Sequence, residues 1–319
     1  MSAPRSNSSA RKLFRRLSPE TRHLRLLRSR PTSGPLRIVP DRIKFRHQSI
    51  CIRGEIVKRR TMSGTLHATI DDGICTLTIE NSEKRNALSP SILRSIEKEI
   101  STAEQRDDIR ALVITGSGDR AFSSGYDISE FEAADEGEGS RAFEKAVTSI
   151  YEFPYPTIAM INGDTYGGAM ELIAVCDLRI AVDEASFAVT PAKLGLVYGD
   201  RGINQLMHHI GPANVQELLF TARSIDADRA AEMGLLNRVV DQSALEDTTY
   251  DIAEDISTNA PKSLRGMKRI VRSLLDKRSL NETEKEFVQH IRDEARESKD
   301  HQEGVQAFSE GREPTFNDE

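Results

Sequence analysis

Several features are scarce in this 319-residue chain, and each scarcity excludes a class of protein. Cysteine occurs only at Cys51, Cys75 and Cys176, too far apart for a disulfide framework or a zinc site. The seven histidines include one adjacent pair, with no cysteine or carboxylate cluster at ligand spacing, so we expect no metal site. No stretch approaches the roughly 18 uninterrupted apolar residues that a membrane span needs. We therefore expect ordinary thiols in a reducing compartment and no membrane partner.

Lysine is also scarce after residue 62, where the charge of the chain changes sign. Residues 1–62 carry 17 Lys and Arg against three acids. The other 257 residues carry 27 Lys and Arg against 47 Asp and Glu, and only nine of those 27 are Lys. Such an acidic, lysine-poor body is typical of adaptation to high salt, where screening weakens self-repulsion. An acidic protein of an ordinary cytosol is the other interpretation.

The basic N-terminal segment, residues 1–62, contains Ser, Pro and Arg but no sustained apolar periodicity. We expect it to be a disordered tail, and three interpretations stay open. It is an organelle transit peptide, a nucleic-acid-binding arm, or an over-extended start with Met62 as the true initiator. The abrupt change of charge at Met62 favours the third.

After Met62 the sequence alternates short apolar strands with amphipathic helices, which predicts an α/β fold with buried, largely parallel sheets. Strands are expected at 74–79, 111–115 and 157–161, followed by a strand pair over 178–182 and 185–189. Ser89 and Pro90 begin a helix as N-cap and first residue, and another helix is expected around 141–150. From Val215 onward the pattern is nearly all helical, ending in helices at 253–259, 261–276 and 282–297.

A glycine turn at residues 163–172 follows the third of these strands and opens a helix that carries Glu171. The backbone N–H groups of such a turn point outward, with the positive end of the helix dipole behind them. This arrangement favours an anion beside Glu171. A second glycine turn, residues 121–128, has the same setting between a strand and a helix. Two such turns supply the two donors that an oxyanion hole requires.

These motifs resemble those of the enoyl-CoA hydratase/isomerase (crotonase) superfamily, over residues 67–316. Further matching segments lie at 85–88, 176–179, 187–195, 230–239 and 303–316. The resemblance implies a crotonase-like spiral of ββα turns over 63–254 and a helical oligomerisation region over 255–319. It also implies a homotrimer or a dimer of trimers, and a coenzyme A thioester as substrate. The N–H groups of Tyr126 and Gly168 would bind the thioester oxygen, with no metal and no cofactor beyond the CoA of the substrate.

The reaction is narrowed by one departure from the family pattern. Hydratases of the family use two glutamates, and Glu171 matches the first. The second position falls on Pro191, flanked by Thr190 and Ala192. Residues 190–198 instead resemble the methylmalonyl-CoA decarboxylase branch, although that branch tends to carry histidine at Tyr126. Decarboxylation yields the thioester enolate without prior proton abstraction, and Thr190 and Tyr198 would hold the leaving carboxylate.

Alternatives remain for the activity. An enoyl-CoA hydratase or isomerase of fatty-acid β-oxidation would use Glu171 alone as base. A non-catalytic, RNA-binding member would use the basic tail, but the acidic body would repel a phosphate backbone, so no nucleic-acid partner is expected. The expected location is the cytoplasm, or an organelle matrix if residues 1–62 are a transit peptide.

The CoA moiety is expected to lie beside basic and small polar residues near the two glycine turns. Lys84 and Arg85 precede Asn86 at a strand end, and Lys262 and Lys268 would reach the phosphates from a neighbouring subunit. The resemblance adds Ser124, Asp127 and Ile128 to this set.

Overall fold

The computed structural model describes residues 64–133, 137–259, 261–276 and 296–312, together with residues 286, 289, 293 and 314. The expected tail at 1–62 lies outside the described residues, as does most of the helix expected at 282–297. Among the helices of the described part, none is both long and apolar enough to cross a membrane.

The described fold begins with a hairpin of β1 (Thr65–Asp71) and β2 (Ile74–Glu80), paired antiparallel along their whole length. Asp72 and Gly73 connect the strands with φ of 41° and 80°. A two-residue turn with positive φ at both positions matches the right-handed twist of the flanking strands.

The larger sheet continues from this hairpin as a parallel sheet, with the strand order β1-β2-β3-β5-β7-β10. Its further strands are β3 (Ala111–Gly116), β5 (Thr157–Ile161), β7 (Leu178–Val182) and β10 (Arg238–Val240). Every residue of β3 and β5 is buried, so both faces of the central sheet are covered, as parallel sheets require. Helix α7 (Leu245–Ser257) packs across β2, β3, β5 and β7, and α1 (Pro90–Glu104) packs on β1 and β2.

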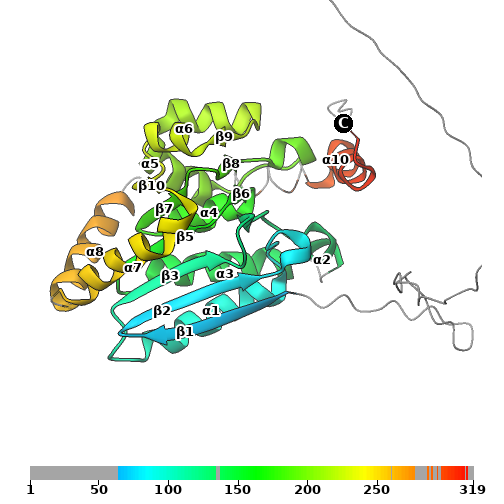
Figure 1. Cartoon of the computed structure of the whole chain (residues 1–319). Coiled ribbons are helices and arrows are strands. Elements are labelled where there is room, and N and C mark those ends of the chain that lie inside the picture. The colour runs from blue at the N-terminus through cyan, green and yellow to red at the C-terminus, as the bar shows by residue number, and fades with distance from the viewer. Residues whose placement is uncertain are drawn as a thin grey trace, which may run out of the picture. The chain divides into compact units, whose positions relative to one another are not determined.

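The smaller sheet has the order β4-β6-β8-β9; its first three strands each follow a long strand of the larger sheet, and β9 comes later in the chain. These are β4 (Ala121–Ser123), β6 (Asp164–Tyr166), β8 (Ser186–Ala188) and β9 (Ile225–Asp226). The order long strand, short strand, helix therefore repeats along the chain (Figure 1). The repeats end in α2 (Ile128–Ala133) and α3 (Glu138–Glu152), in α4 (Gly168–Val175), and in α5 (Asp200–Thr221). The expected α/β fold is confirmed.

One expectation about strands was wrong, and another was incomplete. The strands expected over 178–182 and 185–189 form, but they do not pair, because β7 belongs to the larger sheet and β8 to the smaller one. The region after Val215 was expected to be nearly all helical; it is mostly helical but also holds two short strands, since β9 pairs with β8, and β10 completes the larger sheet beside β7. Both concern pairing between distant segments, which local periodicity does not report.

The C-terminal part contains α6 (Ala227–Glu232), α8 (Pro261–Asp276) and α10 (Lys299–Glu310), besides α7. Helix α1 begins as expected, with the Ser89 side chain accepting a hydrogen bond from the Ile92 N–H and Pro90 as first residue. Helix α7 runs across residue 254, where a division between core and helical region was expected; that division stays a prediction.

Candidate active site

The two glycine turns lie against each other at the ends of β4 and β6. A Cβ atom on Gly125 would lie 2.7 Å from the Tyr166 carbonyl oxygen and 3.1 Å from the Gly168 nitrogen, so only glycine fits between them. Gly125 and Gly167 have φ of +91° and +56°, which side chains with a Cβ rarely adopt. The expected meeting of the two turns is thus present in the structure.

The backbone around Tyr126 indicates where its N–H points. Leu88 donates to the Gly125 carbonyl oxygen at 2.7 Å and accepts from the Asp127 N–H at 3.0 Å, in a parallel bridge beside Tyr126. Because N–H groups of extended backbone alternate in direction, the Tyr126 N–H points away from Leu88. Gly168 is the first residue of α4, whose opening N–H groups have no acceptor within the helix. The two turns can therefore present two donors to one oxygen.

The Tyr126 side chain packs on the other glycine turn, residues 163–172. A Cβ on Gly168 would lie 2.6 Å from Cε1 of its ring, and the ring also stacks edge-on against Phe143 with centroids 4.6 Å apart. The ring therefore forms a wall of the site beside the turn at residues 163–172, which is called the oxyanion turn below.

Glu171 lies one turn inside α4, a helix buried along its whole length. Its side chain is only 7% exposed. A Cβ on Gly202 in α5 would lie 2.8 Å from its Oε2 atom and 2.7 Å from Cε1 of Tyr198. Sequence reasoning missed Gly202, because a glycine near a helix start gives no signal of its own.

Tyr198 and Thr190 both meet the oxyanion turn at Gly167. The Tyr198 hydroxyl donates to the Gly167 carbonyl oxygen at 3.3 Å, and a Cβ on Gly167 would lie 3.4 Å from Oγ1 of Thr190. Burial raises the pKa of Tyr198 well above its ordinary value, and the charges of Glu171 and Tyr126 raise it further. Tyr198 is thus a neutral hydrogen-bond donor beside a carboxylate.

Pro191, expected at the second-acid position of the hydratases, begins the 3-10 helix η2 (Pro191–Leu194). Thr190 precedes it as N-cap. The structure thus places the hydroxyl side chains of Thr190 and Tyr198 near Gly167, and the Tyr198 ring beside Glu171. This set of groups can bind an anion and move a single proton.

Three of the residues expected to hold CoA form one hydrogen-bonded group. The Lys84 Nζ atom lies 2.6 Å from Oδ2 of Asp127 and donates to Ser129 at 3.2 Å. The Ser124 hydroxyl donates to the Lys84 carbonyl oxygen at 2.9 Å, and Ile128 begins α2 directly after Asp127. Asp127 is buried, whereas the Lys84 side chain stays 37% exposed and available to a ligand.

Arg85 joins this group only through its backbone, since its carbonyl oxygen accepts from the Ser124 N–H at 2.9 Å. Its side chain lines a separate cavity of about 370 Å³ with Arg120, Asp119, Asp164 and Glu184. Arg85 and Asn86 both have left-handed backbone, with φ of 52° and 57°. Asn86 holds this conformation by donating to the carbonyl oxygens of Ser117 and Ala121, at 2.9 and 2.7 Å.

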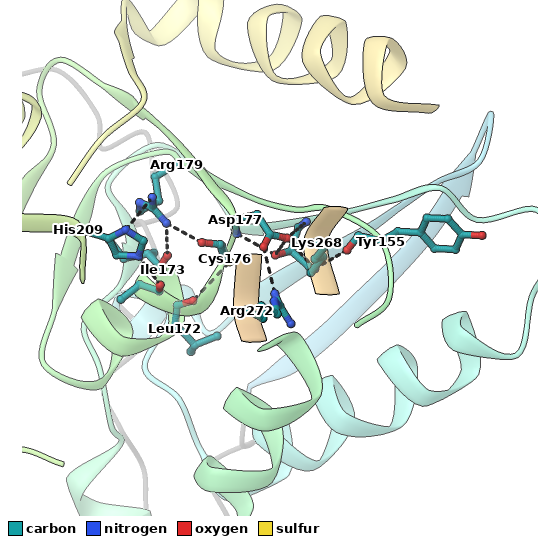
Figure 2. Close-up of polar contacts among 11 residues, drawn as sticks. Tyr155, Leu172, Ile173, Cys176, Asp177, Arg179, His209, Lys268 and Arg272 are labelled. Carbon is teal, nitrogen blue, oxygen red and sulfur yellow. Dashed lines mark hydrogen bonds and ion pairs between the residues drawn. The ribbon is translucent and has the colours of Figure 1, made fainter. Parts of the chain in front are cut away.

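Lys268 lies in a buried ionic cluster rather than at a surface (Figure 2). Its Nζ atom lies 2.6 Å from Oδ2 of Asp177, its side chain is 7% exposed, and it donates to the Tyr155 carbonyl oxygen. Burial lowers its pKa to about 8, against the opposing charge of Asp177. The expectation that Lys268 contacts CoA phosphates was therefore wrong; the Lys262 side chain lies outside the described part.

A second buried contact holds the far end of α4, and its role was not anticipated. Arg179 is 3% exposed and donates to the carbonyl oxygens of Cys176 at 2.6 Å and Ile173 at 3.4 Å (Figure 2). His209 donates from Nε2 to the Ala174 carbonyl oxygen at 2.8 Å, and burial lowers its pKa to about 4. A cation at the C-terminus of a helix interacts favourably with the helix dipole. Arg179 therefore stabilises the dipole of α4, whose positive end lies at the oxyanion turn. The 176–179 motif was visible in the sequence, but the sequence did not show that Arg179 binds the C-terminal carbonyl groups of α4.

Comparison with known proteins agrees with the geometry. Residues 69–319 match the family model for Enoyl-CoA hydratase/isomerase. Methylmalonyl-CoA decarboxylase of Escherichia coli is 35% identical over 248 residues, which cover 76% of this chain and 94% of that protein. Carnitinyl-CoA dehydratase of Citrobacter koseri is 33% identical over 265 residues, which cover 80% of this chain and 99% of that protein.

A solved structure gives the same result. Methylmalonyl-CoA decarboxylase in complex with 2-nitronate-propionyl-CoA superposes with a TM-score of 0.74 at 34% identity, covering 80% of this chain and 99% of that one. The family match, the relatives and the shared fold agree with the motifs at Gly125 and Gly168. The chain therefore belongs to the enoyl-CoA hydratase/isomerase (crotonase) family and is an acyl-CoA enzyme of that family.

Proposed function

We propose that this enzyme decarboxylates a methylmalonyl-CoA-type thioester. One observation carries the proposal: Thr190 and Tyr198 bring hydroxyl groups to the oxyanion turn, while the second-acid position holds Pro191. Decarboxylation needs no base to form the enolate, so a site with Glu171 and two hydroxyls suffices. The similarity to methylmalonyl-CoA decarboxylase supports the same choice.

In this mechanism the thioester oxygen accepts hydrogen bonds from the Tyr126 and Gly168 N–H groups. Thr190 holds the substrate carboxylate out of the thioester plane, so that the breaking C–C bond overlaps the carbonyl π system. Tyr198 joins it when its O–H turns from the Gly167 carbonyl oxygen to the carboxylate. The bond breaks, CO₂ leaves, and the electron pair forms the enolate. Each preorganised donor contributes roughly 3–4 kcal/mol to such an oxyanion. Water then supplies a proton to the α-carbon, with Glu171 as the nearby acid–base group that relays it, giving the shortened acyl-CoA and hydroxide that is neutralised by the solvent.

The proposal extends to the surroundings of the site. CoA would lie along the group formed by Lys84, Ser124, Asp127 and Ile128, with Arg85 further out, and no other cofactor or metal would take part. Met267, Ile270 and Val271 on α8 are more than half exposed, an apolar face that suits contact with another copy in a homotrimer or dimer of trimers. We place the enzyme in the cytoplasm.

Dehydration or hydration is the second candidate. Relatives named carnitinyl-CoA dehydratase are nearly as similar to this chain and are covered almost completely. Such a reaction, or an isomerisation, would use Glu171 as the base that moves the proton at the α-carbon.

The deciding experiment incubates the full chain separately with methylmalonyl-CoA, crotonyl-CoA and carnitinyl-CoA and follows the products by mass. The proposal expects CO₂ and propionyl-CoA from the first substrate. Turnover of either other substrate without any CO₂ from methylmalonyl-CoA would overturn it. RNA binding with a steep salt dependence, and no thioester turnover, would instead favour a non-catalytic family member.

A further inference from the structure

Residues 190–198 form a segment that is joined to the oxyanion turn at both ends. Thr190 approaches Gly167 at the start, and the Tyr198 hydroxyl donates to the Gly167 carbonyl oxygen at the end. Between them lies the short helix η2, closed by Gly195 with φ of 66°. A 3-10 turn has poorer hydrogen-bond geometry than an α-helix, so its placement depends on outside contacts.

The middle of this segment is held by α10, more than 100 residues further along the chain. The His301 Nδ1–H group donates to the Leu194 carbonyl oxygen at 2.9 Å. Gly304 is buried against the same residue, where a Cβ would lie 2.6 Å from the Leu194 Cα and 2.7 Å from its carbonyl carbon. Because these residues are three apart in a helix, they present one face to Leu194.

Helix α10 is itself capped at its start and bonded at its end, which stabilises the helix that carries this face. Ser298 caps its start by accepting from the His301 N–H at 3.1 Å. Arg312 folds back on its end, with bonds of 2.6 and 2.9 Å to Glu303 and of 2.6 Å to Glu310. The contacts to Leu194 therefore come from a capped helix rather than from a loose end.

We propose that His301 and Gly304 are positioning residues of the active site. Through Leu194 they fix the 190–198 segment, and hence the Thr190 and Tyr198 hydroxyls, against the turn that binds the thioester oxygen. The consequence for catalysis rests on the proposed function, but the structural link does not. A misplacement of about 1 Å costs up to roughly a hundredfold in rate, which is why a distant helix matters here.

The structural link is tested by amide hydrogen exchange of the full chain. His301→Leu and Gly304→Ala should raise exchange across residues 192–198 by about fivefold to tenfold, the worth of one hydrogen bond. His301→Asn should restore protection, because its Nδ2 group can replace the Nδ1 donor. Gly266→Ala in α8 is the control, since nothing lies within 4 Å of a Cβ there. Unchanged exchange in both test variants would overturn the proposal.

The consequence is tested by two activities of the same variants. Decarboxylation of methylmalonyl-CoA should fall about tenfold in kcat/KM, whereas α-proton exchange of propionyl-CoA, which needs only Glu171 and the oxyanion turn, should not change. A loosened segment with full decarboxylation would contradict the positioning role. A wild-type protein that decarboxylates nothing would instead contradict the proposed function, and amide exchange would still decide the role of α10.

Discussion

The carboxylate of Glu171 lies against Gly202, the third residue of α5, with Oε2 only 2.8 Å from the place of a Cβ. The ring of Tyr198 shares that space, at 2.7 Å. The room for both side chains therefore depends on the absence of a side chain at position 202. The start of α5 also favours a negative charge, because the opening turn of a helix carries its positive end.

Gly202→Ala should lower kcat by about tenfold to a hundredfold, since the added methyl group must displace Glu171 or Tyr198. Alanine is a better helix former than glycine by about 1 kcal/mol, so the backbone itself gives no reason for a loss. The measurement is kcat and KM with methylmalonyl-CoA, beside the melting temperature. Gly266→Ala, in open space on α8, is the matched control and should leave kcat and KM unchanged. Full activity of Gly202→Ala would contradict the packing.

Glu171→Gln separates the two chemical steps. Proton exchange at the α-carbon of propionyl-CoA requires a base. Loss of the Glu171 carboxylate should therefore slow this exchange by a factor of about 10² to 10⁴. Decarboxylation forms the enolate without a base and should fall less. Both rates are measured on the same preparation, by deuterium incorporation and by CO₂ release. An equal loss of both would indicate that Glu171 also serves the bond-breaking step.

Tyr198→Phe should selectively weaken decarboxylation. A hydrogen bond to a charged group contributes about 1.5–3 kcal/mol, which corresponds to roughly tenfold to a hundredfold in kcat/KM. Proton exchange of propionyl-CoA, which has no carboxylate to hold, should persist. Tyr166→Phe is the control, because that hydroxyl bonds Ser186 at 2.6 Å. Equal effects of the two variants would exclude a role of Tyr198 in carboxylate binding.

Local patterns predicted much of this fold. The apolar runs at 111–115 and 157–161 became β3 and β5, and Ser89 and Pro90 began α1 as expected. The two glycine turns were expected to supply paired donors, and they lie against each other, with no room for a Cβ on Gly125. These elements depend on residues that are close together in the sequence, so local patterns suffice to predict them.

Contacts between distant segments were not predictable in this way. The three residues of β10 gain their strand conformation from pairing with β7, and no periodicity marks them. The amphipathic pattern of α8 did not show that Lys268 faces inward to Asp177. Gly202 and Gly304 likewise act through the space they leave for Glu171 and Leu194, which appears only when the chain is folded.

The buried pair of Lys268 and Asp177 should make stability depend on pH in the alkaline range. Burial lowers the pKa of Lys268 from its ordinary 10.5 to about 8. Between these two pH values the unfolded chain still binds the proton that the folded chain has lost. The free energy of unfolding therefore increases with pH in this range because of Lys268. The gain is roughly 2–3 kcal/mol and is absent below pH 8, where both states are protonated.

Urea unfolding at pH 7.5 and 10 measures this gain, with Lys268→Met as the variant that should lack it. Arg272, which also pairs with Asp177 at 3.0 Å, keeps that carboxylate partnered in the variant. The same pH dependence in both proteins would show that Lys268 does not titrate in this range.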